Sequence, residues 1–180
     1  MKNRLRFLND YAPGYQKCCR VILKKHGTVT AGNSSGVNDG AGATILADET
    51  SIVEHNLKPI ARIVAYSYTG VDPNFMGIGP VDAINQVLKS AGLTKNDIGL
   101  FDINEAFAAQ FLACEKLLEL DAEKTNVCGG AIALGHPVSA SGNRIISNLA
   151  YSLQRTGERY GVGASCIGGG QGISVLLERC

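Results

Sequence analysis

The hydrophobic and polar positions along the chain alternate between runs typical of strands and stripes typical of helices. Runs rich in β-branched and aromatic residues predict strands. Between them, apolar residues recur at i, i+3, i+4 and i+7, the spacing of a helix with one buried face. The predicted strands cover residues 43–47, 60–68, 99–103, 160–165 and 173–177. The helical stripes are Ile84, Val87, Leu88 and Ala91, then Phe107, Phe111, Cys114 and Leu118, then Ile145, Leu149 and Leu153.

Strands that alternate with helices of this length indicate an α/β domain. The last two predicted strands are joined through "GGGQG", which leaves no room for a helix. A parallel crossover needs a dozen or more residues, so these two strands are expected to pair antiparallel.

Glycine is concentrated in four segments, which are "TAGNSSGVNDGAGA", "MGIGP", "CGGAIALGHPVSASG" and "CIGGGQG". Each segment lies beside the end of a predicted strand or helix. We therefore expect these segments to form loops at strand ends, where α/β proteins bind their ligands.

Charge and composition exclude several classes of protein. The net charge is +1, but residues 1–25 are strongly basic and the rest of the chain is mildly acidic. A nucleic-acid-binding body needs a clustered basic surface, so this distribution argues against one. No apolar run approaches the roughly 20 residues of a membrane helix, and the N-terminal stretch lacks the apolar core of a secretory signal.

The six cysteines are therefore expected to be reduced thiols of a cytosolic or organelle-matrix protein. They are Cys18, Cys19, Cys114, Cys128, Cys166 and Cys180. Since no CxxC pair is present, we expect no zinc site and no other metal.

His136 stands between Gly135 and Pro137, in a segment of small residues that leads into a predicted helix. Exposed N–H groups at a helix N-terminus disfavour an imidazolium, so a neutral ring at this place is a candidate general base. Gly135 allows close approach of a ligand, and Pro137 fixes the direction of the chain. A surface histidine in a tight turn fits the same pattern, and the motif alone leaves both interpretations open.

Other polar residues near the glycine segments also have two interpretations. Cys166 is either an inert buried cysteine or a thiol in a loop whose N–H groups bind an oxyanion. Asn104 either caps the following helix or orients a water or a carbonyl. Ser35 contributes to anion binding or only to a polar turn, and Met76 fills the core or lines an adaptable ligand tunnel.

Taken together and in this order, five segments resemble the C-terminal half of the thiolases, the enzymes that cleave or form 3-ketoacyl-CoA. The segments are "GTVTAGNSSGVNDGAGA", "MGIGPV", "NEAFAAQ", "NVCGGAIALGHP" and "CIGGGQGI". The resemblance covers residues 27–180, whereas residues 1–26 match poorly. It implies a thiolase-like C-terminal domain, with a mixed sheet and helices packed on both faces. It also implies that CoA and acyl-CoA are substrates, that no cofactor is bound permanently, and that the full-length form is a homo-oligomer.

The resemblance implies roles for seven residues. His136 would be the base that activates the nucleophilic cysteine, and Cys166 would exchange a proton with the α-carbon of acetyl-CoA. Asn104 would hold the water of an oxyanion hole that, with His136, stabilises the thioester enolate. Gly168 would supply a backbone donor to a second oxyanion hole. We therefore expect the side chains of His136 and Cys166 to converge in one cleft, with Asn104 on its wall. The path of the pantetheine and acyl groups would be bordered by Ser35, Met76 and Phe107.

The sequence departs from the thiolase pattern in two ways. Thiolases carry their acylated cysteine in an N-terminal half whose motif surrounds none of the six cysteines here. In addition, Ser139 stands where the family typically has glycine, and its side chain could crowd the helix start or the acyl pocket.

Two interpretations follow from these departures. The chain is the C-terminal portion of a thiolase acyltransferase, or it is a catalytically silent CoA-binding or dimerisation module. A decarboxylating condensing enzyme is disfavoured, because the cysteine of "CIGGG" is typical of thiolases.

The family also suggests an exposed surface and a compartment. A thiolase half of this kind packs against the other half through shared central helices, so the stripe of Phe107, Phe111 and Leu118 is expected to be an uncovered apolar face. The segments "KTNVCGGAIALGHP" and "GIGPVDAI" look most like those of the mitochondrial 3-ketoacyl-CoA type, and "LLERC" is not a peroxisomal tail. We expect the mitochondrial matrix, with the cytoplasm as the alternative.

Overall fold

The computed structural model describes residues 27–180, so the poorly matching segment 1–26 lies outside the described residues. In chain order the elements are η1 (Ala31–Asn33), α3 (Glu49–Glu54), β1 (Ala61–Gly70), η2 (Pro73–Ile78), α4 (Gly79–Ala91), η3 (Lys95–Asp97), β2 (Leu100–Ile103), α5 (Ala108–Leu118), α6 (Ala131–Leu134), α7 (Ser141–Thr156), β3 (Tyr160–Ile167) and β4 (Gln171–Arg179). Within this range no helix is long and apolar enough to cross a membrane.

The strands form one mixed sheet in the order β1-β4-β3-β2. β4 pairs antiparallel with both β1 and β3, and β2 pairs parallel with β3. The predicted mixed sheet is confirmed, as is the antiparallel pairing of the last two strands. Because β2 and β3 run in the same direction, the residues that follow them lie at one end of the sheet.

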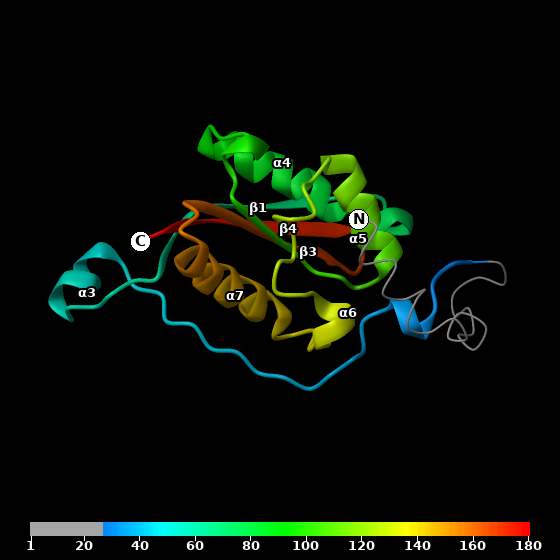
Figure 1. Ribbon diagram of the computed structural model, residues 1–180, viewed down its shortest axis with the longest axis horizontal. Helices are drawn as coiled ribbons and strands as arrows, with labels where there is room; N and C mark the ends of the chain where they lie inside the picture. Colours follow the sequence, from blue (N-terminus) through cyan, green and yellow to red (C-terminus); the bar gives the residue numbers. More distant parts are fainter. Residues whose placement is uncertain (1–26) are drawn as a thin grey trace.

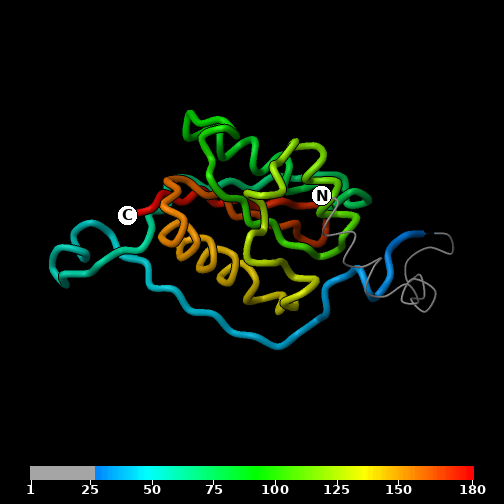
Figure 2. Tube along the Cα trace, viewed as in Figure 1, coloured from blue at the N-terminus to red at the C-terminus, as the bar shows by residue number. Residues whose placement is uncertain are grey.

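The strand predicted at residues 43–47 is wrong. These residues belong to a loop, 36–48, in which Ile45 is 90% and Leu46 74% exposed, and none of the five pairs with a strand in the described part of the chain. Strand-forming residues make a strand only where a neighbour supplies hydrogen bonds and a packing surface. Figure 2 shows the loop passing along the α7 side of the domain on its way to α3.

Helices cover both faces of the sheet, as predicted: α4 and α5 lie on one face and α7 on the other (Figure 1). α4 begins at Gly79 with Pro80 in its first turn, where the missing N–H breaks no helical hydrogen bond, and it stops at Gly92, whose φ of 66° is left-handed. The buried stripe residues are Ile84, Val87 and Leu88 on α4, Phe111, Cys114 and Leu118 on α5, and Ile145, Leu149 and Leu153 on α7.

The prediction that the α5 stripe forms an uncovered face is wrong. Phe111 is only 8% exposed and Leu118 1%, because both pack into the domain's own core with residues of α4 and the sheet. Phe107 is half-buried. Four of the exposed apolar side chains lie on loop 36–48 and α3, a surface we call the loop strip. It consists of Val37, Ile45, Leu46 and Val53.

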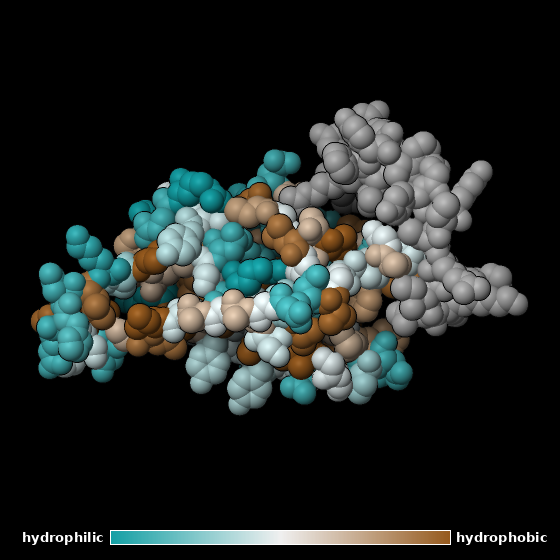
Figure 3. All heavy atoms as spheres, turned by 90° about the horizontal axis from the view of Figure 1, so that it is seen from below, coloured by the Kyte–Doolittle hydropathy of each residue, from teal (hydrophilic) through white to brown (hydrophobic). Residues whose placement is uncertain are grey.

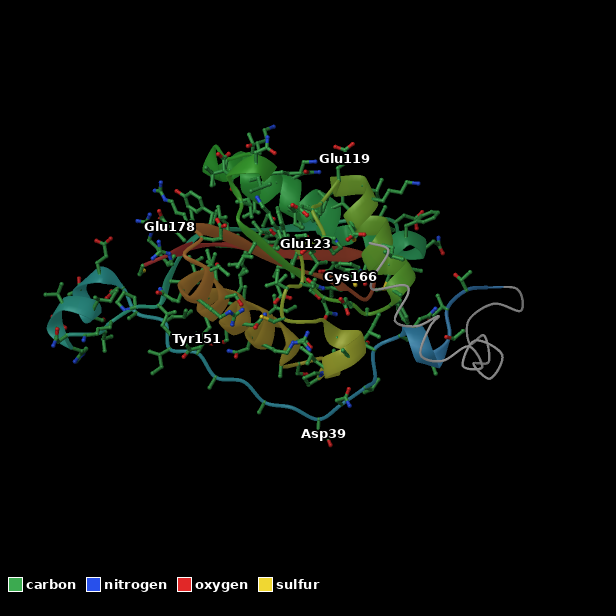
Figure 4. All side chains as sticks on the ribbon, viewed as in Figure 1. Asp39, Glu119, Glu123, Tyr151, Cys166 and Glu178 are labelled. Carbon is green, nitrogen blue, oxygen red and sulfur yellow. The ribbon has the colours of Figure 1, made fainter. Side chains whose placement is uncertain are left out.

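The loop strip runs along the side of the domain that carries α7. Asn143 of α7 donates from Nδ2 to Thr44 Oγ1 over 2.6 Å, which fastens the loop to the helix. Asp39, at the middle of the loop, points away from the domain (Figure 4). Figure 3 views this side and shows hydrophobic residues interspersed among polar ones along it.

α7 lies very close to β3 because two positions of that strand are glycine. A Cβ atom at Gly161 would lie 2.9 Å from Leu149 Cδ1, and one at Gly163 would lie 2.9 Å from Ile146 Cδ1. Such distances are shorter than van der Waals contact between carbon atoms. The missing side chains therefore let α7 pack its apolar stripe directly onto the strand backbone.

Asp102 of β2 is a carboxyl group inside this core. It is 6% exposed, and Asn148 Nδ2 on α7 donates to its Oδ2 over 2.7 Å. Burial raises the pKa of Asp102 to about 6, although the bond from Asn148 and the charge of Arg144 act in the opposite direction. A carboxyl that is hard to ionise inside the fold makes stability depend on pH.

The loop strip generates the first prediction. We expect the 180-residue chain to self-associate in dilute buffer, because exposed apolar residues favour association. Sedimentation velocity should show species larger than a monomer. The double substitution of Ile45→Ser with Leu46→Ser should shift the distribution toward monomer, whereas Tyr151→Ser, at an exposed position of α7 outside the loop strip, should not. A compact, monodisperse monomer of the unaltered chain would contradict the prediction.

The second prediction concerns Asp102→Asn. The folded-state pKa of Asp102 is raised, so the aspartate destabilises the fold progressively as pH rises from about 4 to above 6. Asparagine keeps an acceptor for Asn148 and cannot ionise. Urea unfolding should give the variant little advantage near pH 4 and an advantage of roughly 2–3 kcal/mol by about pH 7. A difference between the two proteins that does not change with pH would show that Asp102 is not the titrating group.

Candidate active site

His136 lies in the loop between α6 and α7, and its backbone is held by a distant part of the chain. α6 ends at Gly135, whose φ of 92° few other residues adopt. The backbone N–H of His136 donates to Gly36 O and to Asn38 Oδ1, each over 3.1 Å. The glycine-rich "TAGNSSG" segment and the residues after it thus hold the histidine in place.

The imidazole ring has a defined tautomer. Nδ1 of His136 lies 2.7 Å from Ser141 Oγ, and that hydroxyl donates its hydrogen to Pro137 O over 3.1 Å. A serine hydroxyl has one hydrogen, which Pro137 O accepts, and the Nδ2 of Asn104, which only donates, faces Nε2. We therefore assign the ring hydrogen to Nδ1, which donates to the Ser141 oxygen. Nε2 of His136 therefore carries the free lone pair.

Asn104 presents an amide to that lone pair. It follows β2, is 1% exposed, and its Nδ2 lies 3.4 Å from His136 Nε2. Its Oδ1 accepts from Arg144 Nη2 over 3.4 Å, which leaves the NH₂ group for the histidine side. The capping interpretation does not hold, because α5 begins after Phe107 and Asn104 is not its N-cap.

The electrostatic environment keeps His136 neutral. Burial lowers the pKa of the imidazole, and the positive charge of Arg144 lowers it further. The sequence argument expected a neutral ring because of a helix N-terminus, but burial and Arg144 are the causes in the structure. A neutral ring with a free Nε2 lone pair can accept a proton from a thiol at neutral pH.

Cys166 lies near the end of β3, two residues before the turn that leads into β4 (Figure 4). It belongs to the same end of the sheet as Asn104, since Asn104 N donates to Ala164 O over 2.9 Å. Burial raises the pKa of the Cys166 thiol, so it holds its proton at neutral pH. Convergence of its side chain with His136 in one cleft stays a prediction.

Gly168 begins the exposed turn after β3, and a Cβ atom there would meet nothing within 4 Å. The following Gly169 and Gly170 have φ values of 90° and 89°, so the turn itself requires glycine at those two positions. The space around Gly168 does not require glycine at this position. Its role as a backbone donor stays a prediction.

Two of the three residues expected along the substrate path lie together. Ser35 N and Ser35 Oγ both donate to Ala106 O, over 3.0 and 3.1 Å, and the neighbouring Ser34 pairs with Phe107 in an isolated bridge. Met76 is on η2 and half-buried. Its neighbour Gly77 accepts a bond from the Cys114 thiol of α5 over 3.3 Å, which places η2 against that helix.

The structure adds residues that sequence reasoning missed. Ser141 sets the histidine tautomer, and Arg144 also donates from Nη1 to Gly135 O over 2.6 Å. Glu105 accepts from Asn126 Nδ2 over 2.9 Å and from Ile132 N over 3.4 Å, which ties the loop before His136 to the end of β2. One signal was available: Arg144 is the only Lys, Arg, Asp or Glu between Lys124 and Arg155.

Ser139 is exposed and its φ is not left-handed, so the serine needs no strained backbone at this position. The residues described here hold no group of three or more His, Cys, Asp or Glu side chains arranged to bind a metal ion. The arrangement around His136 is instead suited to proton transfer and to hydrogen bonding of a developing oxyanion.

Family models match almost the whole of the described chain. The model of the thiolase C-terminal domain matches residues 57–179, and that of the thiolase N-terminal domain matches residues 17–50. Loop 36–48 therefore aligns with the end of the N-terminal domain, and β1 to β4 align with the C-terminal domain.

Individual relatives and solved structures agree. The sequence is 58% identical over 157 residues to mitochondrial 3-ketoacyl-CoA thiolase of Mus musculus, covering 87% of this chain and 40% of that protein. It is 52% identical over 160 residues to acetyl-CoA acetyltransferase of Escherichia coli K12, covering 89% and 41%. The fold matches the crystal structure of human mitochondrial 3-ketoacyl-CoA thiolase with a TM-score of 0.90 and 55% identity, over 92% of this chain and 42% of that one.

The chain thus spans about two fifths of the length of the relatives it matches. Over that span its sequence, its sheet topology and the segments around His136 and Cys166 all agree with one family. The chain belongs to the thiolases.

Proposed function

We propose that the protein works as an acyl-CoA C-acyltransferase, which cleaves 3-ketoacyl-CoA with CoA or forms it from acetyl-CoA. The observation that carries the proposal is the pairing of His136 Nε2 with Asn104 Nδ2, a neutral base beside an amide donor. A human relative with a TM-score of 0.90 has been solved in complex with CoA, which supports CoA as a substrate. The proposed steps need proton transfers and thioester chemistry only, without a permanently bound cofactor.

His136 acts first in the proposed cleavage. Its Nε2 takes the proton of a nucleophilic cysteine thiol, and the sulfur bonds to the 3-keto carbon of the substrate. The bond between the 2- and 3-carbons then breaks, and its electron pair passes to the acetyl-CoA fragment as an enolate. A water held by Asn104, together with the protonated imidazole, donates to the enolate oxygen.

Cys166 completes the release of acetyl-CoA. Its thiol gives a proton to the α-carbon of the enolate, a role that requires a protonated thiol in the resting site. Burial, which raises the pKa of this thiol, meets that requirement. In the direction of synthesis the Cys166 thiolate takes the proton back.

The other four residues of the proposed site hold the acyl group and the pantetheine arm of the substrate. Gly168 N–H would donate to the carbonyl oxygen of the acylated cysteine while the CoA sulfur attacks it. The Cys166 thiolate left by the first step takes the proton of the CoA thiol, and the departing cysteine sulfur takes back the proton held by His136. The pantetheine and acyl groups would pass between the start of α5, where Phe107 lies and Ser35 donates to Ala106 O, and η2 with Met76.

The nucleophilic cysteine is assigned to the thiolase N-terminal half, whose family model reaches this chain only over residues 17–50. We propose that the full-length form is a homo-oligomer that works in fatty acid β-oxidation. We propose the mitochondrial matrix as its compartment, which the word mitochondrial in the names of the relatives supports. A cytosolic acetyl-CoA acetyltransferase of Mus musculus is 52% identical over 153 residues, which keeps the cytoplasm as the alternative.

The third prediction separates an enzyme from a silent CoA-binding module. This chain alone should cleave no acetoacetyl-CoA above background, and adding a thiolase N-terminal half in trans should restore cleavage. In the complemented pair, His136→Ala should lower kcat by at least about 10²–10⁴-fold, since a general base contributes that much. Cys166→Ser should also abolish turnover.

Matched controls come from the exposed residues His55 and Cys180. His55→Ala and Cys180→Ser should leave the complemented activity unchanged. Turnover by the isolated chain, with the acyl group trapped on one of its own cysteines, would contradict the assignment of the nucleophile. A correctly folded pair without activity would favour the silent module.

The fourth prediction concerns the protonation of the thiols. Hydrogen bonds from Ser152 and Arg155 lower the pKa of the exposed Cys128, whereas burial raises the pKa of Cys114 to about 11 and also raises that of Cys166. Because the thiolate is the reactive form, iodoacetamide near pH 7.5 should alkylate Cys128 before Cys114 and Cys166. Peptide mass spectrometry gives the order, and faster labelling of Cys166 than of Cys128 would show that Cys166 rests as a thiolate.

A further inference from the structure

We propose that Arg144 is a positioning residue of the site, whose guanidinium selects the orientation of the Asn104 side-chain amide and fixes the distance between Asn104 and His136. The expected effect of Arg144 on catalysis rests on the function proposed above. The orientation of the Asn104 amide by Arg144 rests only on contacts within this chain. Arg144 is placed on α7, three residues after Ser141.

The guanidinium joins the two segments that make the site. Nη1 of Arg144 donates to Gly135 O over 2.6 Å, directly before His136, and Nη2 donates to Asn104 Oδ1 over 3.4 Å. Asn104 follows β2 and His136 follows α6, so no shared element sets their separation. One planar group with two fixed donors spans the gap between them.

The contact to Oδ1 decides what the amide offers to His136. A guanidinium only donates hydrogen bonds, so the Asn104 oxygen must face Arg144 and the NH₂ group must face Nε2. Rotation of the amide by half a turn would bring Oδ1 against the Nε2 lone pair and an N–H against the guanidinium. Asn104 is 1% exposed, so water cannot compensate for these lost hydrogen bonds.

Ser141 and Arg144 divide the alignment of the site between them. They lie three residues apart and therefore on the same face of α7. Ser141 binds Nδ1 of His136 and sets the tautomer, while Arg144 holds the Asn104 amide that faces the opposite ring nitrogen, Nε2. The helix thus presents both groups that determine which nitrogen is the base and what faces it.

A charge alone does not account for the arrangement. The positive charge of Arg144 contributes to the low pKa of His136 and also acts to lower the pKa of Asp102 on β2. Lysine would keep the positive charge, but its single ammonium group cannot donate to Gly135 O and Asn104 Oδ1 in one fixed plane. Arg144→Lys therefore separates the charge from the geometry.

The structural experiment uses NMR on the full chain with ¹⁵N-labelled asparagine, carrying Ile45→Ser and Leu46→Ser to limit association. The unaltered site should give a nuclear Overhauser effect between the Asn104 amide protons and the His136 ring. Arg144→Lys should abolish it, while Arg155→Lys, on the same helix and outside the site, should retain it. An effect that persists in Arg144→Lys would overturn the proposal, whatever the activity of the protein.

The kinetic experiment uses the complemented pair and acetoacetyl-CoA. Arg144→Lys should lower kcat by about 10²-fold, the order expected for a small misplacement of a catalytic group, with little change in KM. Because the effect passes through Asn104, the same substitution should cause little further loss in an Asn104→Ala background. Full additivity of the two losses would overturn the proposal.

The two experiments distinguish failure of the inference from failure of the proposed function. If the unaltered pair shows no thiolysis, the proposed function fails, and the NMR result still decides whether Arg144 orients Asn104. Arg144→Lys must keep the melting temperature within a few degrees of the parent for either result to count. If Arg144→Lys does not, Arg144→Gln takes its place, because glutamine retains a planar donor for Asn104 Oδ1. Arg144→Gln should show part of the nuclear Overhauser effect between Asn104 and His136. Complete absence of that effect in folded Arg144→Gln would overturn the proposal.

Discussion

The close packing of α7 on β3 is the constraint on which the site depends. Gly161 and Gly163 remove the side chains that would hold the helix away, and Ile145 and Leu149 occupy the space. The apolar stripe fixes the position of the helix along the strands, and the adjacent face of the same helix carries Ser141, Arg144 and Asn148. These three side chains bind His136, Asn104 and Asp102 respectively. A shift of α7 by a fraction of a turn would break all three contacts together.

Much of the fold follows from pattern because the relevant interactions are local. Glycine after a helix, proline in a first turn and a regular apolar stripe act within a few residues, so α4, α5 and α7 could be predicted. The segment 43–47 has the composition of a strand, but whether it pairs depends on a neighbour that the described part of the chain does not place beside it. The burial of the α5 stripe likewise depends on how α5 sits on α4, which periodicity does not encode.

The candidate site, like the fold, could be predicted only in part from the sequence. His136, Asn104 and Cys166 could be singled out because each stands beside glycine or at a strand end. Their partners were missed, since Ser141 resembles any polar residue in the first turn of an amphipathic helix, and the one signal for Arg144 was its isolation from other charged residues. Their effect arises from the fold, which brings residue 104 against residues 136 and 144. The cause of the low pKa of His136 was also inaccessible, because burial and the position of the Arg144 charge, which lower it, are both set by the fold.

The contact between loop 36–48 and His136 has a consequence for the order in which the protein folds. Asn38 and His136 are separated by 98 residues, and the bond from Asn143 to Thr44 closes a loop of 99. The β3–β4 hairpin and the helices bring together residues that are close in sequence. The two bonds of loop 36–48 close a chain segment of most of the domain, which costs more conformational entropy. The β3–β4 hairpin and the helices can therefore form while the histidine backbone is still unanchored. The pairing of β1 with β4 joins Ala61 to Arg179 and Gly70 to Gln171, so it also requires a long closure. Spectroscopic recovery of the helices then precedes recovery of the site, and the two measure different events.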